Sequence, residues 1–120
     1  MIAAMPPKVL VLVESDPRTS PRPAEAVRMT AGVNTWRRVE ILLYLRGPAI
    51  RLVADVTGQL MEEEGLRRYL SLLAELGQAI LVQADAPELK ELENPLVALC
   101  PVNDEELARL ASTCAVTLRF

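Results

Sequence analysis

The chain has 120 residues, of which 13 are Lys or Arg and 16 are Asp or Glu, so its formal net charge is −3. A length of this order allows one core, and we expect residues 1–120 to form a single domain. The acidic balance argues against a nucleic-acid partner, which usually requires a basic surface. Histidine is absent, which excludes His-based triads and argues against a zinc site, so we predict no metal and no cofactor.

Cysteine usage and the start of the chain point to a cytoplasmic protein. Cys100 and Cys114 are the only cysteines, which is too few for a secreted disulfide framework. Residues 1–7 lack a basic segment, and their apolar run stops at two prolines, so they do not have the pattern of a signal peptide. No stretch approaches the roughly 18 apolar residues that span a bilayer. We expect no membrane partner.

Five aliphatic segments are predicted to be strands. The first, residues 8–14, is an unbroken run of β-branched and aliphatic side chains, which suits a strand buried on both faces of a parallel sheet. The others are residues 38–45, 79–83, 96–100 and 115–120. We expect all five strands to be parallel, with the first two the most buried.

Helices are predicted between these strands. The first begins near Pro23 and ends near Gly32 and Asn34, a short one covers residues 49–56, and a longer one covers residues 63–76. Capping-box spacing is present at Asp85 with Glu88 and at Asn103 with Glu106. Regular alternation of strand and helix implies right-handed crossovers, and therefore an α/β fold with a three-layer α/β/α sandwich.

The loop after the first strand is a candidate anion site. It contains hydroxyls and guanidinium groups just before a helix N-terminus, where amide groups and the helix dipole favour negative charge: Ser15, Arg18, Thr19, Ser20 and Arg22. Such a site would take a small anion such as phosphate, sulfate or a carboxylate. The alternative, which we favour, is that Thr19 or Ser20 only caps the helix and that the arginines are solvated.

Cys100 is the candidate catalytic residue because it ends the fourth predicted strand. An exposed cysteine near Arg46 or a helix N-terminus would have a lowered thiol pKa and could act as a nucleophile. Most cysteines outside disulfides are small buried residues, and we favour that interpretation for Cys100. Cys114 lies at a helix-to-strand junction, where we expect it to pack.

The apolar residues after Gly47 are unusually dense. Ile50, Leu52, Val53, Val56, Leu60 and Met61 exceed what one face of a short helix buries in a small domain. A contiguous apolar surface of this kind usually marks an interface. We therefore expect an oligomer, with residues 49–61 contributing to the contact.

Four segments in order carry a family resemblance. They are the opening strand with its Ser/Pro loop and the spacing Ala24, Val27 and Met29; residues 44–50, with the sequence YLRGPAI; the strand 80–82 after a helix ending in glycine; and residues 103–111 followed by the strand 116–120, which ends in Phe120. Together these segments resemble the DsrE family of small sulfur-relay proteins, which includes the TusD-type subunits. The resemblance implies a five-stranded parallel sheet in the order 4-3-2-1-5, and homo-oligomers or assemblies with related subunits.

The resemblance also implies where a sulfur-carrying cysteine would lie. Sulfur-carrying members of the family place it just after the third strand, whereas residues 83–87 of this chain read QADAP. The sequence therefore favours a DsrE-like oligomeric binding or assembly protein rather than a classical enzyme, and the resemblance implies a link to intracellular sulfur transfer. Two alternatives stay open: a persulfide carrier that uses Cys100, and an anion- or small-molecule-binding protein that uses the loop after the first strand.

Overall fold

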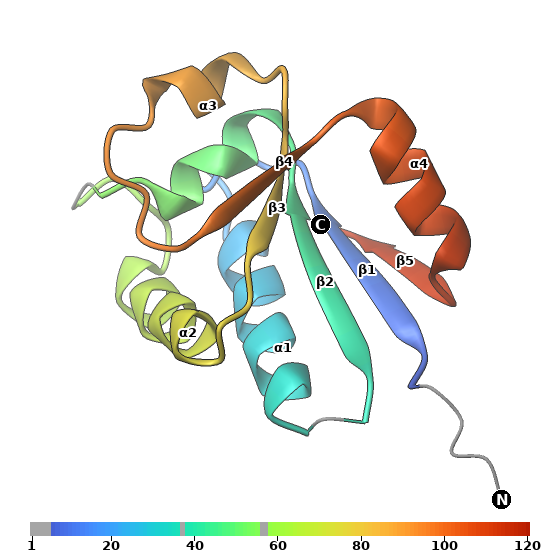
Figure 1. Ribbon diagram of the computed structural model, residues 1–120. Helices are drawn as coiled ribbons and strands as arrows, with labels where there is room; N and C mark the ends of the chain where they lie inside the picture. Colours follow the sequence, from blue (N-terminus) through green and yellow to red (C-terminus); the bar gives the residue numbers. More distant parts are fainter. Residues whose placement is uncertain (1–5, 37, 56–57) are drawn as a thin grey trace, which may run out of the picture.

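The computed structural model describes residues 6–36, 38–55 and 58–120, and its centre is a parallel sheet (Figure 1). Its strands are β1 (Lys8–Val13), β2 (Glu40–Leu45), β3 (Ile80–Gln83), β4 (Leu99–Val102) and β5 (Val116–Arg119). They pair in the order β4-β3-β2-β1-β5, and every pairing is parallel. Both the predicted strand order and the predicted parallel arrangement are confirmed.

The helices form layers on both faces of the sheet (Figure 1). They are α1 (Arg22–Trp36), the 3₁₀ helix η1 (Gly47–Val53), α2 (Glu63–Glu75), α3 (Pro87–Glu91) and α4 (Asp104–Thr113). Side chains of α1, η1 and α2 form the larger buried cluster with one face of the sheet, and α4 packs over the other face. The predicted three-layer sandwich is confirmed. Among the residues described, no helix is both long and apolar enough to cross a bilayer.

The side chains of β1 alternate between the two buried clusters on opposite faces of the sheet. Val11 and Val13 point into the larger cluster, whereas Leu10 points into the smaller one beside α4. β2 pairs with β1 over six residues, from Lys8 with Glu40 to Val13 with Leu45. An unbroken apolar run is thus required, because both faces of the strand are covered.

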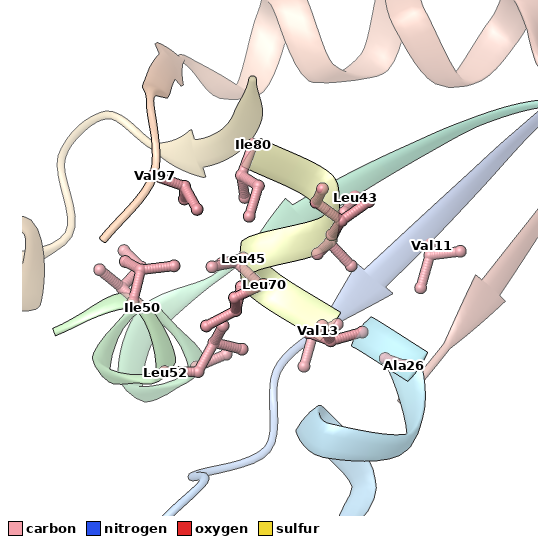
Figure 2. Packing of buried hydrophobic residues seen from close by; sticks show 14 of the residues in the cluster. Val11, Val13, Ala26, Leu43, Leu45, Ile50, Leu52, Leu70, Ile80 and Val97 are labelled. Carbon is pink, nitrogen blue, oxygen red and sulfur yellow. The ribbon is translucent and has the colours of Figure 1, made fainter. Parts of the chain in front are cut away.

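The prediction of a surface patch at residues 49–61 is wrong for its first part. Ala49, Ile50, Leu52 and Val53 are all 0% exposed, because η1 packs inward against the core. Figure 2 shows Ile50 and Leu52 beside Leu45 and Leu70. Met61 is 42% exposed, Leu60 is half-buried, and Val56 lies outside the described residues. The apolar density after Gly47 is therefore mainly core.

Two predicted helix boundaries also differ from the structure. α1 continues past Gly32 to Trp36, and the Thr35 hydroxyl donates to the Gly32 carbonyl at 2.7 Å.

The capping box at Asn103 is confirmed, since its side chain accepts from the Glu106 N–H at 2.8 Å. The one expected at Asp85 is wrong: α3 begins at Pro87 after Ala86, whose side chain cannot cap. A proline at the first position leaves fewer amide groups that need a cap.

Candidate functional site

Three segments that follow neighbouring strands meet at the carboxyl edge of the sheet. They are the loop after β1, η1 after β2 and α3 after β3. This edge is where ligands bind in open α/β sheets. A cavity of about 180 Å³ lies between the three segments, and its charged lining consists of Arg18, Arg51, Glu88 and Glu91.

Arg51 is held in this cavity by the residues around it. Ile50 and Leu52 are fully buried, so the backbone on both sides of Arg51 is fixed while its own side chain remains partly exposed. Its Nη1 lies 3.6 Å from Glu88 Oε2, and its Nη2 lies 3.6 Å from Glu91 Oε2. Both carboxylates come from α3, so these ion pairs connect η1 to α3.

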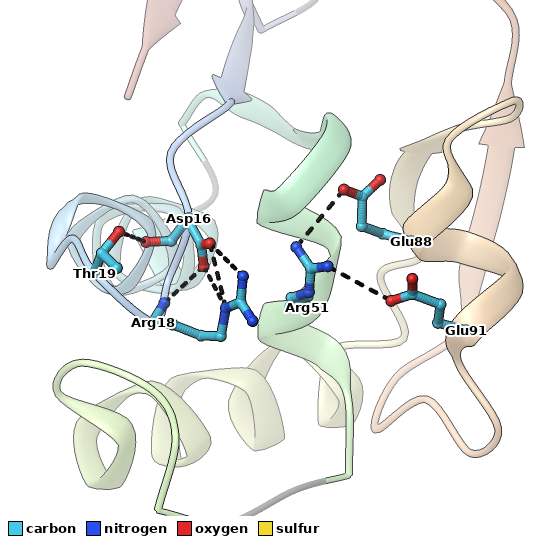
Figure 3. A network of polar contacts seen from close by, with 6 residues as sticks. All are labelled: Asp16, Arg18, Thr19, Arg51, Glu88 and Glu91. Atoms are coloured by element: carbon cyan, nitrogen blue, oxygen red, sulfur yellow. Dashed lines mark hydrogen bonds and ion pairs between the residues drawn. The ribbon is translucent and has the colours of Figure 1, made fainter.

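Arg18 reaches the same cavity from the loop after β1. Its Nε and Nη2 donate to the Asp16 carboxylate at 3.1 and 2.9 Å, and its backbone N–H donates to Asp16 Oδ1 at 2.9 Å. The side-chain hydrogen bond from Arg18 is the main cause that lowers the pKa of Asp16, and the charge of Arg51 lowers it further. Figure 3 shows the two arginines between Asp16 on one side and Glu88 and Glu91 on the other.

The loop residues proposed from sequence divide into two groups. Arg18 lines the cavity, but Arg22 turns toward β5, where its Nη2 donates to the Arg119 carbonyl at 3.1 Å and its guanidinium lies 5.8 Å from the centre of the Phe120 ring. Ser20 Oγ accepts from the Arg22 N–H at 3.2 Å, which is a local capping contact. The Thr19 hydroxyl lies 3.5 Å from the Asp16 carbonyl, and Ser15 is half-buried in the same loop.

Sequence reasoning missed Arg51, Glu88 and Glu91. The sequence pattern places Glu88 in a capping box and Arg51 in an apolar segment, and neither pattern indicates a site. The available signal was the position of Arg51, which is the only charged residue between Gly47 and Val53. A single charge within a buried segment indicates a side chain directed to a specific partner.

The two cysteines lie in different environments. Cys100 lies within β4, opposite Leu81 of β3, and is exposed, so the expectation that it is buried is wrong. The strand begins later than predicted, at Leu99, and β4 is an edge strand with one neighbour. Cys114 is half-buried at the end of α4, and its Sγ donates to the Leu110 carbonyl at 3.4 Å.

Arg46, considered as a partner for Cys100, has other partners. Its Nη1 donates to Tyr44 Oη at 3.1 Å and to Asp104 Oδ1 at 2.9 Å, which connects the end of β2 to the start of α4. Burial raises the pKa of Tyr44, and hydrogen bonding to Arg46 lowers the pKa of Asp104.

The sheet order and the helices on both faces define a three-layer α/β/α fold built on a parallel sheet. The solved structure of the YchN protein from E. coli has this fold and matches with a TM-score of 0.78, covering 95% of this chain and 99% of that chain at 13% sequence identity. No family model matches this chain, and a search of curated proteins found no match. A likeness at this identity shows the fold alone, and the function has to be argued from the site.

The lowered pKa of Asp16 predicts a pH-dependent stability. Because the folded-state pKa lies below the ordinary value of 3.8, the ionised carboxylate stabilises the fold above that pH, and this contribution is lost as pH falls through the lowered pKa. We expect Asp16→Asn to cost up to about 1 kcal/mol at neutral pH, and nothing once the wild-type carboxyl is protonated. Urea unfolding from pH 7 to pH 2, followed by circular dichroism, measures the difference.

The matched control is Asp85→Asn, which changes an exposed carboxylate with no ion pair to any residue in the described ranges. Its difference from wild type should stay close to zero across the same pH range. A cost of Asp16→Asn that persists undiminished at the acid end would contradict the assignment.

Proposed function

We propose that this protein is a DsrE-like, cytoplasmic binding and assembly protein that does not relay sulfur through a thiol after β3. The observation that carries the proposal is the segment 83–87, which begins at the last residue of the third strand and contains no cysteine. Its residues have structural roles. The Gln83 side-chain oxygen accepts from the Gly47 N–H at 3.0 Å, the Ala84 N–H donates to the Val102 carbonyl at 3.0 Å, and Ala86 is buried.

The contact between Gln83 and Gly47 supports this interpretation. Gly47 has φ of +57°, a left-handed conformation that glycine adopts without strain and other residues rarely do. In this conformation its N–H meets Gln83, which connects the end of β3 to the start of η1. The position at which a sulfur carrier would present its thiol is thus used to hold the carboxyl edge together.

Cys100 is the alternative sulfur carrier, and its surroundings do not favour the role. Reactive cysteines lie in electropositive surroundings that lower the thiol pKa. Arg46 is the residue expected to lower the thiol pKa. Its guanidinium group already donates hydrogen bonds to Tyr44 and Asp104. Two cysteines outside disulfides suit a reducing compartment, which supports a cytoplasmic location.

A sulfur-loading experiment tests the proposal. Glutathione persulfide is incubated with wild type and with Cys100→Ser, and intact mass is measured after removal of the donor, with no free thiol added. We expect Cys100 to be alkylated readily because it is exposed, yet to retain no added sulfur. A stable increase of one sulfur atom in wild type that disappears in Cys100→Ser would instead establish the persulfide carrier.

We place the assembly surface on β5 rather than on residues 49–61. Within the part of the chain that the structure describes, β5 has β1 as its one neighbour, and all four residues of β5 are exposed. Val116 and Leu118 are 45% and 37% exposed and lie in register with Val9 and Val11. An exposed edge strand with apolar side chains readily pairs with another chain, and we assign that place to β5 of a second copy.

The oligomeric state provides the second test, by light scattering coupled to size exclusion at micromolar concentration. Wild type should be at least dimeric, and Val116→Lys should shift it to monomer because a charge would be buried in the contact. The controls are Thr117→Lys, on the other face of the same strand, and Met61→Lys, in the segment 49–61. A monomeric wild type, or dissociation by Met61→Lys alone, would contradict the assignment.

A further inference from the structure

We propose that β5 pairs in an antiparallel manner with β5 of a second copy across a two-fold axis at Leu118, and that this contact closes the assembly at two subunits. The inference rests on the proposed function, in which β5 carries the assembly surface, and it adds the register and the stoichiometry of the contact. It follows from the backbone groups of β4 and β5, which are the two edges of the sheet (Figure 1).

The backbone of β5 presents two residues to the free edge. The Phe120 N–H donates to the Leu12 carbonyl at 2.9 Å, and the Phe120 carbonyl accepts from the Glu14 N–H at 2.9 Å. Phe120 therefore directs both of its backbone groups at β1. Because successive residues of a strand direct these groups to alternate sides, Thr117 and Arg119 direct theirs away from β1.

A two-fold axis at Leu118 brings these outward groups together. Thr117 of each copy then lies opposite Arg119 of the other, and the two residues exchange both backbone hydrogen bonds. The Arg119 carbonyl already accepts from Arg22 Nη2 at 3.1 Å, and its second lone pair remains for the second copy. An axis at Thr117 would instead place Arg119 opposite Ala115, whose N–H already donates to β1 at 2.8 Å.

The same register matches the side chains on both faces of the sheet. Leu118 lies opposite Leu118 of the second copy, and Val116 lies opposite Phe120, on the face where the larger buried cluster continues. On the other face Thr117 lies opposite Arg119, whose guanidinium already forms an ion pair within its own chain at 3.1 Å. Apolar pairs across two strands stabilise their pairing, whereas like charges directly opposite each other destabilise it.

Pro101 closes the other edge of the sheet. The Ala84 N–H donates to the Val102 carbonyl at 3.0 Å, so Val102 directs its backbone groups at β3 and Pro101, one residue earlier, faces outward. Proline has no N–H to offer an incoming strand, and it commonly protects edge strands from pairing. Pairing of β5 with β4 of the next copy would build an open ribbon, whereas pairing of β5 with itself closes at two subunits.

Disulfide trapping tests the register in a background that carries Cys100→Ser and Cys114→Ser. In Leu118→Cys the two thiols face each other, with Cα atoms about 4.5 Å apart, a separation that a disulfide accepts. Val116→Cys is the matched control, because it lies on the same face and is more exposed, 45% against 37%. Its copy lies about 13 Å away along the strand. Mild oxidation should yield about tenfold more covalent dimer for Leu118→Cys, measured by intact mass.

Thr117→Cys mixed with Arg119→Cys is the second trap, since these residues lie opposite each other. It covers the case in which Leu118→Cys is shown by circular dichroism not to fold. Light scattering before oxidation should find two subunits. Equal trapping at 116 and 118, no trapping by either route, or an assembly of more than two subunits would overturn the inference while leaving the proposed function in place. A monomeric wild type would contradict both, and sulfur loading is judged separately.

Discussion

The burial of η1 is the constraint on which the carboxyl edge of this protein depends. Four of its seven residues, Ala49, Ile50, Leu52 and Val53, have side chains that are completely removed from solvent. Burying a side chain of the size of Leu or Ile stabilises a fold by about 1.5–3 kcal/mol. The segment after β2 is therefore as fixed as a core strand, although it lies at the edge where ligands usually bind in such sheets.

The candidate site follows from this rigidity. Arg51 lies between two buried residues, so its side chain leaves the core at a defined point and meets Glu88 and Glu91 of α3. Gly47 and Gln83 fix the start of the same segment. The structural similarity to YchN concerns the fold, whereas the chemistry at this edge comes from charged side chains of this chain's own sequence.

Much of the fold could be predicted from sequence because the signals are local. The apolar run of residues 8–13 predicts the strand β1, and the Asn103–Glu106 capping box predicts the start of the helix α4. The site could not be predicted in the same way, since the placement of Arg18 and Arg51 in one cavity depends on how three separate segments meet. The dense apolar sequence after Gly47 is equally compatible with a core segment and with an interface. Only the tertiary structure shows which of the two it forms. The exposure of Cys100 could not be predicted either, because it depends on the position of its strand at an edge of the sheet.

η1 thus belongs to the core and fixes the backbone from which Arg51 reaches the site. Chemical unfolding of Leu52→Ala, compared with Met61→Ala, tests it most directly, with the oligomeric state of each variant measured alongside. Leu52→Ala should lose about 2–5 kcal/mol of unfolding free energy, because it leaves a cavity in a packed core. Met61→Ala should change it by less than about 0.5 kcal/mol, because Met61 is largely accessible. If Leu52→Ala instead dissociated an oligomer while leaving the stability of the subunit unchanged, η1 would be an interface and the account would be wrong.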